Sequence, residues 1–237
     1  MAQQPPTAEA LQRNFLLMTV GFSVNHATVV TVIALATAHL GQRLSAYDLA
    51  LFNASYVVTG LAAQGAVIAA AGLRGALLTG TGLYCVYVLS FLAATLCDEG
   101  SAVQWLVALS GAVVGGFGAG FLWGAQGAYF TANSEAYAAA ARIPCGQATA
   151  QLSGTFATYY LATEVGTKLL ASLVMGSAWG GAGAEHTVYA LFTLLAGLSA
   201  MSLLWISPLQ PQQATADLGL VAVEPEPGPG AAAAEPS

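Results

Sequence analysis

Charged residues are scarce in this sequence. Only 7% of its 237 residues are Asp, Glu, Lys or Arg, whereas about 25% of the residues in an average soluble domain are charged. A water-facing surface cannot be built from so few, which excludes a soluble enzyme. The net charge of −6 and the lack of a basic patch exclude a nucleic-acid partner. Three cysteines are too few for a disulfide scaffold.

Long apolar stretches fill most of the chain instead. Hydrophobic residues make up 57% of the sequence, and the mean hydropathy is +0.68. Because about 20 apolar residues in a helix span the hydrocarbon core of a bilayer, these stretches predict an all-α fold, a polytopic transmembrane helical bundle. Windows of about 19 residues predict six spans, at residues 14–40, 49–71, 75–97, 102–130, 152–175 and 187–206. The fifth span is the least apolar, because it contains Glu164 and Lys168.

Composition and charge divide the chain into three parts and predict its orientation. Residues 1–13 form an N-terminal segment, residues 14–206 the six-helix domain, and residues 207–237 an acidic tail whose Pro, Gly and Ala content is typical of disorder. With the N-terminus inside, the inner segments hold Arg13, Arg74 and Arg142 and the outer ones only Arg43. Lys and Arg favour the cytoplasmic side. We therefore expect both termini to be cytoplasmic, although the sequence does not identify the membrane.

Glycines follow a regular spacing in the fourth predicted span. On a helix, residues four apart share a face, and small residues there let a second backbone approach closely. The spacing predicts helix packing, or a smooth surface along which helices slide during transport. The residues concerned are Gly111, Gly115, Gly116, Gly120 and Gly124.

The same span carries a motif, GFGAGFLWGAQGAYFTANS, at residues 116–134. It resembles the signature of the uncoordinated-93-like family, the ion channel regulatory branch of the major facilitator superfamily. The matching positions are Leu122, Trp123, Gln126, Gly127, Tyr129, Thr131 and Ser134. With weaker matches elsewhere, the resemblance covers residues 14–175 and implies the N-terminal six-helix half of a facilitator fold. Two departures are a missing Asp-Arg-x-Gly-Arg pattern before the third span and the presence of one half only.

Ionisable and amide side chains inside the predicted spans are candidates for a substrate or ion pathway. Glu164 and Lys168 lie four residues apart, the spacing at which two side chains meet on one helical face. A charge at the bilayer centre costs about 2.5 to 3.5 kcal/mol, whereas such a pair returns only about 0.2 to 0.5 kcal/mol. Their face should therefore look into the protein or a wet cavity. His26 lies at a similar depth beside Asn25, and Gln126 is a further candidate. Each of these residues is also compatible with a packing role.

Two functions compete at this point. The resemblance implies a regulatory or accessory subunit that contacts a channel or receptor client through its helices. The alternative is a small-solute transporter with a midplane polar site, completed by a second six-helix half. A chain that is one part of a twelve-helix protein is a third reading. No metal-ligand spacing and no nucleophile–base pair is visible, so we expect neither an enzyme nor a cofactor, and lipid as the surrounding partner.

Overall fold

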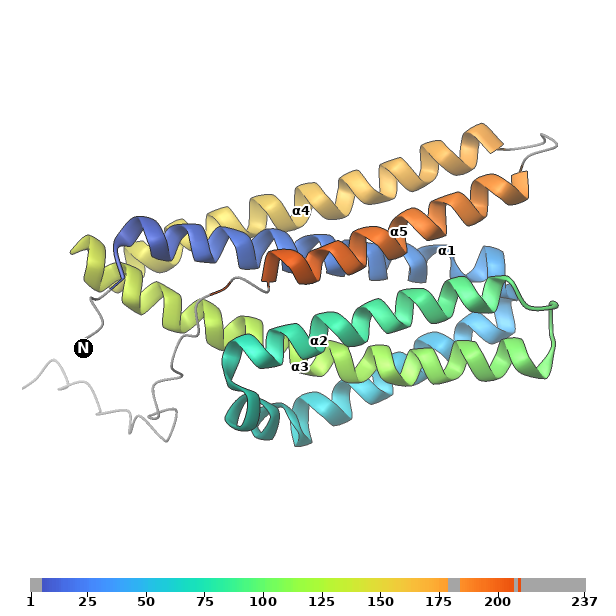
Figure 1. Ribbon diagram of the computed structural model, residues 1–237, viewed down its shortest axis with the longest axis horizontal. Coiled ribbons are helices and arrows are strands. Elements are labelled where there is room, and N and C mark those ends of the chain that lie inside the picture. The colour runs from blue at the N-terminus through green and yellow to red at the C-terminus, as the bar shows by residue number, and fades with distance from the viewer. Residues whose placement is uncertain (1–5, 179–183, 207–208, 210–237) are drawn as a thin grey trace, which may run out of the picture.

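The computed structural model describes residues 6–178, 184–206 and 209, and within them the chain is all α-helical. The predicted tail at 207–237, apart from Leu209, and the first five residues of the N-terminal segment lie outside the described residues. Figure 1 shows the helices lying side by side along one long axis. The described helices are α1 (Ala8–Ala62), α2 (Gln64–Thr95), α3 (Ala102–Ala141), α4 (Cys145–Ala178) and α5 (Ala184–Ile206).

Two glycines interrupt the first two helices. Gly41 in α1 has φ 76° and ψ 160°, and Gly72 in α2 has φ 69° and ψ 171°. Glycine reaches positive φ without the steric cost that a side chain brings. At Gly41 the chain reverses, so that α1 consists of a first arm (8–40) and a second arm (42–62) that runs back along the bundle (Figure 1). The hydroxyls of Thr37 and Ser45 lie 3.3 Å apart across this reversal.

Local sequence explains where the other helices begin and end. Thr7 caps α1 and Ser101 caps α3, each accepting a hydrogen bond from the backbone nitrogen three residues later. The break predicted between the third and fourth spans is confirmed, because the turn around Asp98 lies between the end of α2 and the start of α3. Arg142, with φ 56° and ψ 43°, ends α3 in the left-handed conformation.

Four described helices are long and apolar enough to cross a membrane: α1, α2, α3 and residues Thr187–Ile206 of α5. α4 does not meet this criterion over the described residues, in line with the charges that make it the least apolar of the predicted spans. The helices run past the predicted spans, since α3 continues to Ala141 and α4 already begins at Cys145. The second predicted span, 49–71, is shared between the second arm of α1 and the start of α2. That the chain crosses the membrane six times remains a prediction from the sequence.

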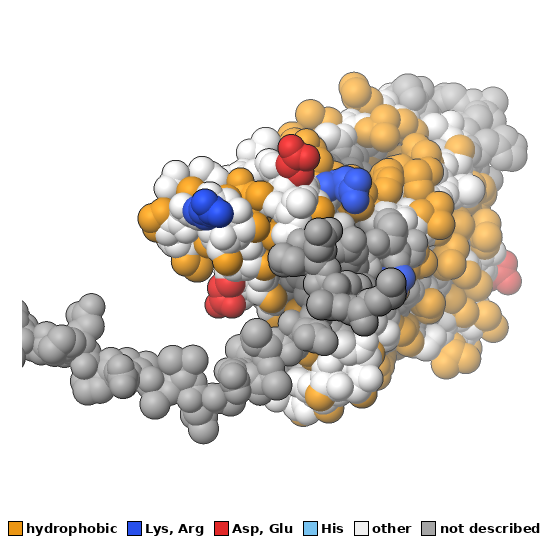
Figure 2. All heavy atoms as spheres, turned by 60° about the vertical axis from the view of Figure 1, so that its left-hand side comes forward, with side chains coloured by type: hydrophobic (Ala, Val, Ile, Leu, Met, Phe, Trp, Pro, Cys, Tyr) orange, Lys and Arg blue, Asp and Glu red, His pale blue; other side chains and the backbone are white. Residues whose placement is uncertain are grey.

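The surface of the bundle carries large apolar side chains. Leu61 is 85% exposed, Leu106 71% and Leu173 72%, and hydrophobic atoms cover much of the face in Figure 2. Soluble proteins rarely expose large contiguous apolar areas. Together with the four long apolar helices, this surface indicates an integral, multi-pass membrane protein in contact with lipid.

The first arm of α1 lies at the centre of the bundle, because its side chains meet residues of α2, α3, α4 and α5. Phe15, Met18 and Phe22 of this arm are fully buried. Residues of the first arm can therefore meet side chains from several helices at once, and this is where the candidate site forms.

Candidate functional site

Aromatic side chains surround His26 halfway along the first arm of α1. The rings of His26 and Tyr160 of α4 are stacked, with centroids 5.3 Å apart and planes at 26°. Trp123 of α3 meets His26 edge-on at 5.2 Å and 85°. These are the stacked and edge-to-face geometries that aromatic rings prefer. We call the whole set the aromatic cluster; its members are Phe22, His26, Tyr84, Trp123, Phe156 and Tyr160.

The charged pair of α4 adjoins this cluster. Lys168 Nζ lies 2.5 Å from Glu164 Oε1, and the two side chains are 40% and 23% exposed, respectively. Tyr160 lies one turn before Glu164, on the same face of α4. Because Tyr160 stacks on the His26 ring, the i,i+4 series of Tyr160, Glu164 and Lys168 places the ion pair next to the aromatic cluster. The structure thus brings three of the sequence-predicted residues, His26, Glu164 and Lys168, to one place.

One ring nitrogen of His26 is left without a hydrogen-bond partner among the described residues. It is Nδ1, which is buried. A neutral imidazole nitrogen can donate or accept, depending on its tautomer. Aromatic faces, a carboxylate, an ammonium group and a free imidazole nitrogen therefore lie within one region, which can recognise a solute that has both charged and apolar parts.

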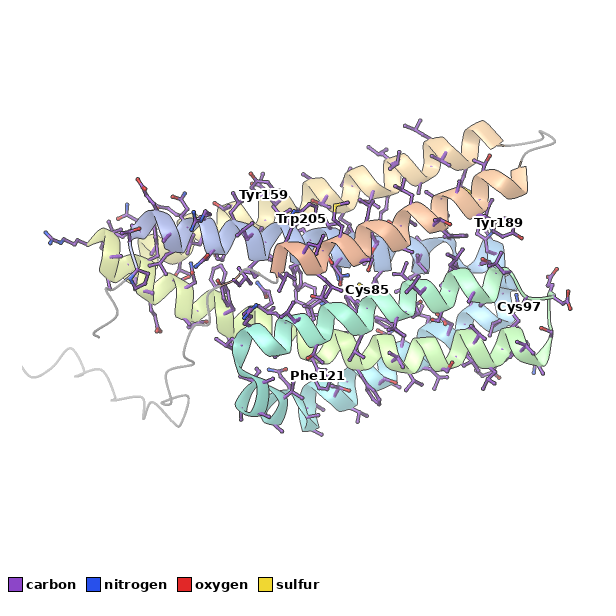
Figure 3. The ribbon with its side chains drawn as sticks, in the orientation of Figure 1. Cys85, Cys97, Phe121, Tyr159, Tyr189 and Trp205 are labelled. Carbon is purple, nitrogen blue, oxygen red and sulfur yellow. The ribbon has the colours of Figure 1, made fainter. Side chains whose placement is uncertain are left out.

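α4 covers this region only in part. Tyr160, Glu164 and Lys168 are half-buried, whereas Val165 and Leu169, each one position after a member of the pair, are more than half exposed. Tyr159 also points away from the bundle (Figure 3). The charged pair consequently lies at the edge of the α1–α4 contact, open on one side within the described chain.

Asn25 does not join the cluster, although it is next to His26 in sequence. Its Nδ2 donates a 2.8 Å hydrogen bond to Ser199 Oγ of α5 and also approaches Cys85 of α2. Cys85 lies between α2 and α5 in Figure 3, and Ser199 donates to its sulfur at 3.2 Å. Adjacent helical residues point about 100° apart, so the two side chains serve different faces of α1.

Most of the signature residues of α3 are buried in the bundle or bonded to the backbone of α3 itself. Leu122 and Tyr129 are fully buried, Ser134 is buried, and Gln126, 8% exposed, lies on α3 one turn after Trp123. The hydroxyls of Thr131 and Ser134 donate to backbone oxygens of α3 itself. Gly127 is exposed. Trp123 is the signature residue that reaches the aromatic cluster.

The spaced glycines of α3 lie against the chain's own helices. A Cβ at Gly120 would stand 2.7 Å from Thr59 Cβ in the second arm of α1, and the other positions are similarly close to a neighbour. Such a distance is closer than side chains tolerate without displacing the neighbour. The contacts are Gly111 with Ser90, Gly115 with Tyr87 and Phe52, Gly116 with Phe52 and Ser55, Gly120 with Thr59, and Gly124 with Gln64.

Sequence reasoning missed most of the aromatic cluster. Phe156, Tyr160, Glu164 and Lys168 repeat every four residues along α4, and Phe22 lies four residues before His26. This spacing could have identified an aromatic and charged stripe on each helix. Sequence reasoning also did not single out Asp48. This residue lies between the first two predicted spans, yet it is 2% exposed and accepts a 2.8 Å hydrogen bond from Tyr87 Oη.

Among the described residues no group of three His, Cys, Asp or Glu side chains is placed to hold a metal ion. The chain matches no protein-family model, no curated protein and no solved structure in the three comparisons made with known proteins. The resemblance of the α3 motif to the uncoordinated-93-like family therefore stays a prediction from sequence.

Proposed function

We propose that the chain binds a small solute at the aromatic cluster and the adjoining Glu164–Lys168 pair, and moves it across the membrane. The observation that carries the proposal is the convergence of His26, Trp123 and Tyr160 from three helices on one region, with the ion pair beginning one turn after Tyr160. Charges and polar groups within apolar spans are costly and usually face a site or a wet cavity. A purely structural ion pair does not need the stacked rings and the unpartnered His26 Nδ1 that surround this one.

The proposal includes six passes through the membrane. The reversal at Gly41 and the break at Gly72 support it, because the first divides α1 into two arms and the second separates residues 64–71 from the rest of α2. α4 has 34 residues, and at about 1.5 Å per residue it exceeds the hydrocarbon thickness of about 30 Å. Its polar stripe is turned toward α1 and α3, which accounts for its lower hydropathy. Six passes place both termini on one side, the cytoplasmic side by the arginine distribution.

The chemistry of the site favours a zwitterionic solute with an apolar body. Glu164 attracts a cationic group, Lys168 attracts an anionic group, and the rings of the aromatic cluster form an apolar wall beside the pair. A cation near such a ring gains further electrostatic stabilisation. Free amino acids with aromatic or aliphatic side chains have these features and define the first panel to test.

An uptake assay with purified protein tests this function. Proteoliposomes would be supplied with radiolabelled neutral amino acids, and uptake would be compared among the wild type, Glu164→Gln and the matched control Glu135→Gln. Glu135 is an exposed residue of α3 away from the cluster. We expect uptake of at least one panel member by the wild type and the control, and its loss in Glu164→Gln. Uptake that Glu164→Gln leaves unchanged contradicts the proposal.

An accessory role is the second candidate, and the half-open charged pair favours it. Lys168 keeps 40% of its side chain exposed within the described chain, and in a membrane this surface needs a polar cover. A channel or receptor client, as the family resemblance implies, or a second six-helix half would supply one. The spaced glycines of α3 already pack against α1 and α2, so they cannot form the surface that contacts a client. That surface would be on α4. Chemical cross-linking from Leu169→Cys to a co-purifying channel, with no solute uptake, would favour this role.

A further inference from the structure

We propose that a cavity at the reversal of α1 binds a small protonated amine, with Asp48 as its counter-ion. The cavity has a volume of about 200 Å³. It lies between the end of the first arm and the start of the second, away from the aromatic cluster. Its lining residues are Ile33, Ala36, Thr37, Gln42, Ser45, Ala46, Asp48 and Leu49.

Asp48 supplies the charge of this site. Its side chain is 2% exposed, Oδ2 accepts the hydrogen bond from Tyr87, and Oδ1 is buried without a hydrogen-bond partner among the described residues. The one ion pair formed within the described part of the chain is that of Glu164 with Lys168. The nearby Arg43 guanidinium lies 5.9 Å from the centre of the Trp105 ring instead.

A buried carboxylate without a cation is unfavourable, because burial removes its hydration and one hydrogen bond does not replace it. A cationic ligand in the cavity offsets that cost. The cavity is lined by one carboxylate and no histidine or cysteine, so a divalent metal finds too few ligands there. A singly charged cation matches the single carboxylate.

The walls of the cavity select an organic ammonium over a bare ion. Ser45 donates to the Gln42 carbonyl oxygen, and Thr37 lies 3.3 Å from Ser45, so hydroxyl oxygens remain as acceptors beside Asp48. An ammonium group has three donors to share among such acceptors. Ile33, Ala36 and Leu49 form an apolar wall. An apolar cavity of about 150 Å³ holds benzene, so this one has room for a ring-sized body.

Benzylamine and benzyl alcohol form a matched pair of probes, because they differ in the charged group alone. Saturation-transfer NMR on the full chain in nanodiscs, at a pH where benzylamine is protonated, would measure binding. We expect benzylamine to bind the wild type at least tenfold more tightly than benzyl alcohol, and Asp48→Asn to remove that preference. The same comparison would be repeated in a Glu164→Gln background, in which the carboxylate beside the aromatic cluster cannot hold the amine. We expect the preference that depends on Asp48 to persist there.

A second variant keeps the proposal testable if Asp48→Asn does not fold. Ala46 is an exposed residue at the rim of the cavity, so Ala46→Trp can fill the space without disturbing the core. We expect this variant to lose benzylamine binding with Asp48 intact. Equal binding of both probes by the wild type, or benzylamine binding unchanged in Asp48→Asn or in Ala46→Trp, would overturn the proposal.

Discussion

Gly120 of α3 packs backbone to backbone against Gly60 of α1. A Cβ at Gly120 would lie 2.9 Å from the backbone nitrogen of Gly60, as well as 2.7 Å from Thr59 Cβ. Where lipid surrounds the helices, close packing replaces the hydrophobic effect as the force between them. The α1–α3 contact therefore depends on the missing side chain at this position.

Gly120→Ala should destabilise the protein by about 1 to 3 kcal/mol, the usual cost of overpacking a well-packed interior. The backbone of Gly60 cannot yield as the end of a flexible side chain would. The midpoint of thermal unfolding in detergent, followed by size-exclusion chromatography, measures the change. Gly127→Ala is the matched control, because nothing lies within 4 Å of a Cβ there, and we expect an unchanged or higher midpoint. Equal midpoints for the two variants would contradict this packing.

Asn25→Ala should lower stability while leaving solute uptake intact. The variant removes the hydrogen bond to Ser199 that joins α1 to α5, and interhelical bonds of this kind contribute about 0.6 kcal/mol, at most about 1.7. Asn53→Ala is the control, because Asn53 is exposed and donates to Leu49 O of its own helix. The same thermal assay, with uptake measured in parallel, checks both parts. Loss of uptake at unchanged stability would place Asn25 in the solute site.

Lys168→Met should destabilise the protein more than the double variant Glu164→Gln, Lys168→Met does. The single substitution leaves the Glu164 carboxylate without its ammonium partner, and an unsatisfied polar group costs about 1 to 3 kcal/mol. The double substitution removes both charges, so no ionised group is left unpaired. Membrane abundance and the thermal midpoint of the two variants give the comparison. A double variant that is the less stable would show that each residue has a separate structural role.

The helical architecture could be predicted from the sequence because lipid dictates it. Apolar stretches, the Asp98 turn and the i,i+4 spacing of Glu164 and Lys168 are local features, and the structure contains all three. The helix limits were less accurate. Ala-rich sequence extends α3 to Ala141, because alanine favours helix whether or not lipid surrounds it.

The arrangement of the site could be predicted only in part. The contacts of His26 with Tyr160 and Trp123 depend on which face each of α1, α3 and α4 turns toward its neighbours. Hydropathy does not determine this orientation. The same limit explains Asn25, which neighbours His26 in sequence but serves the α5 contact. Burial of Asp48 arises from the reversal at Gly41 and the approach of Tyr87, both tertiary features.

Water access to the polar stripe of α4 tests the central claim most directly. Thr167 lies on the same face of α4 as Tyr160, and a substitution there keeps Glu164 and Lys168 unchanged. Leu169 lies on the face opposite Tyr160 and is 58% exposed. Thr167→Cys and Leu169→Cys would each be made in a protein in which Cys97 and Cys145 are replaced by serine. Cys85 can be kept, because it is buried. Both would then be treated in proteoliposomes with a membrane-impermeant thiosulfonate. We expect the thiol at 167 to react at least tenfold faster than the thiol at 169. Equal rates, or a faster reaction at 169, would contradict a water-accessible solute site on this face of α4.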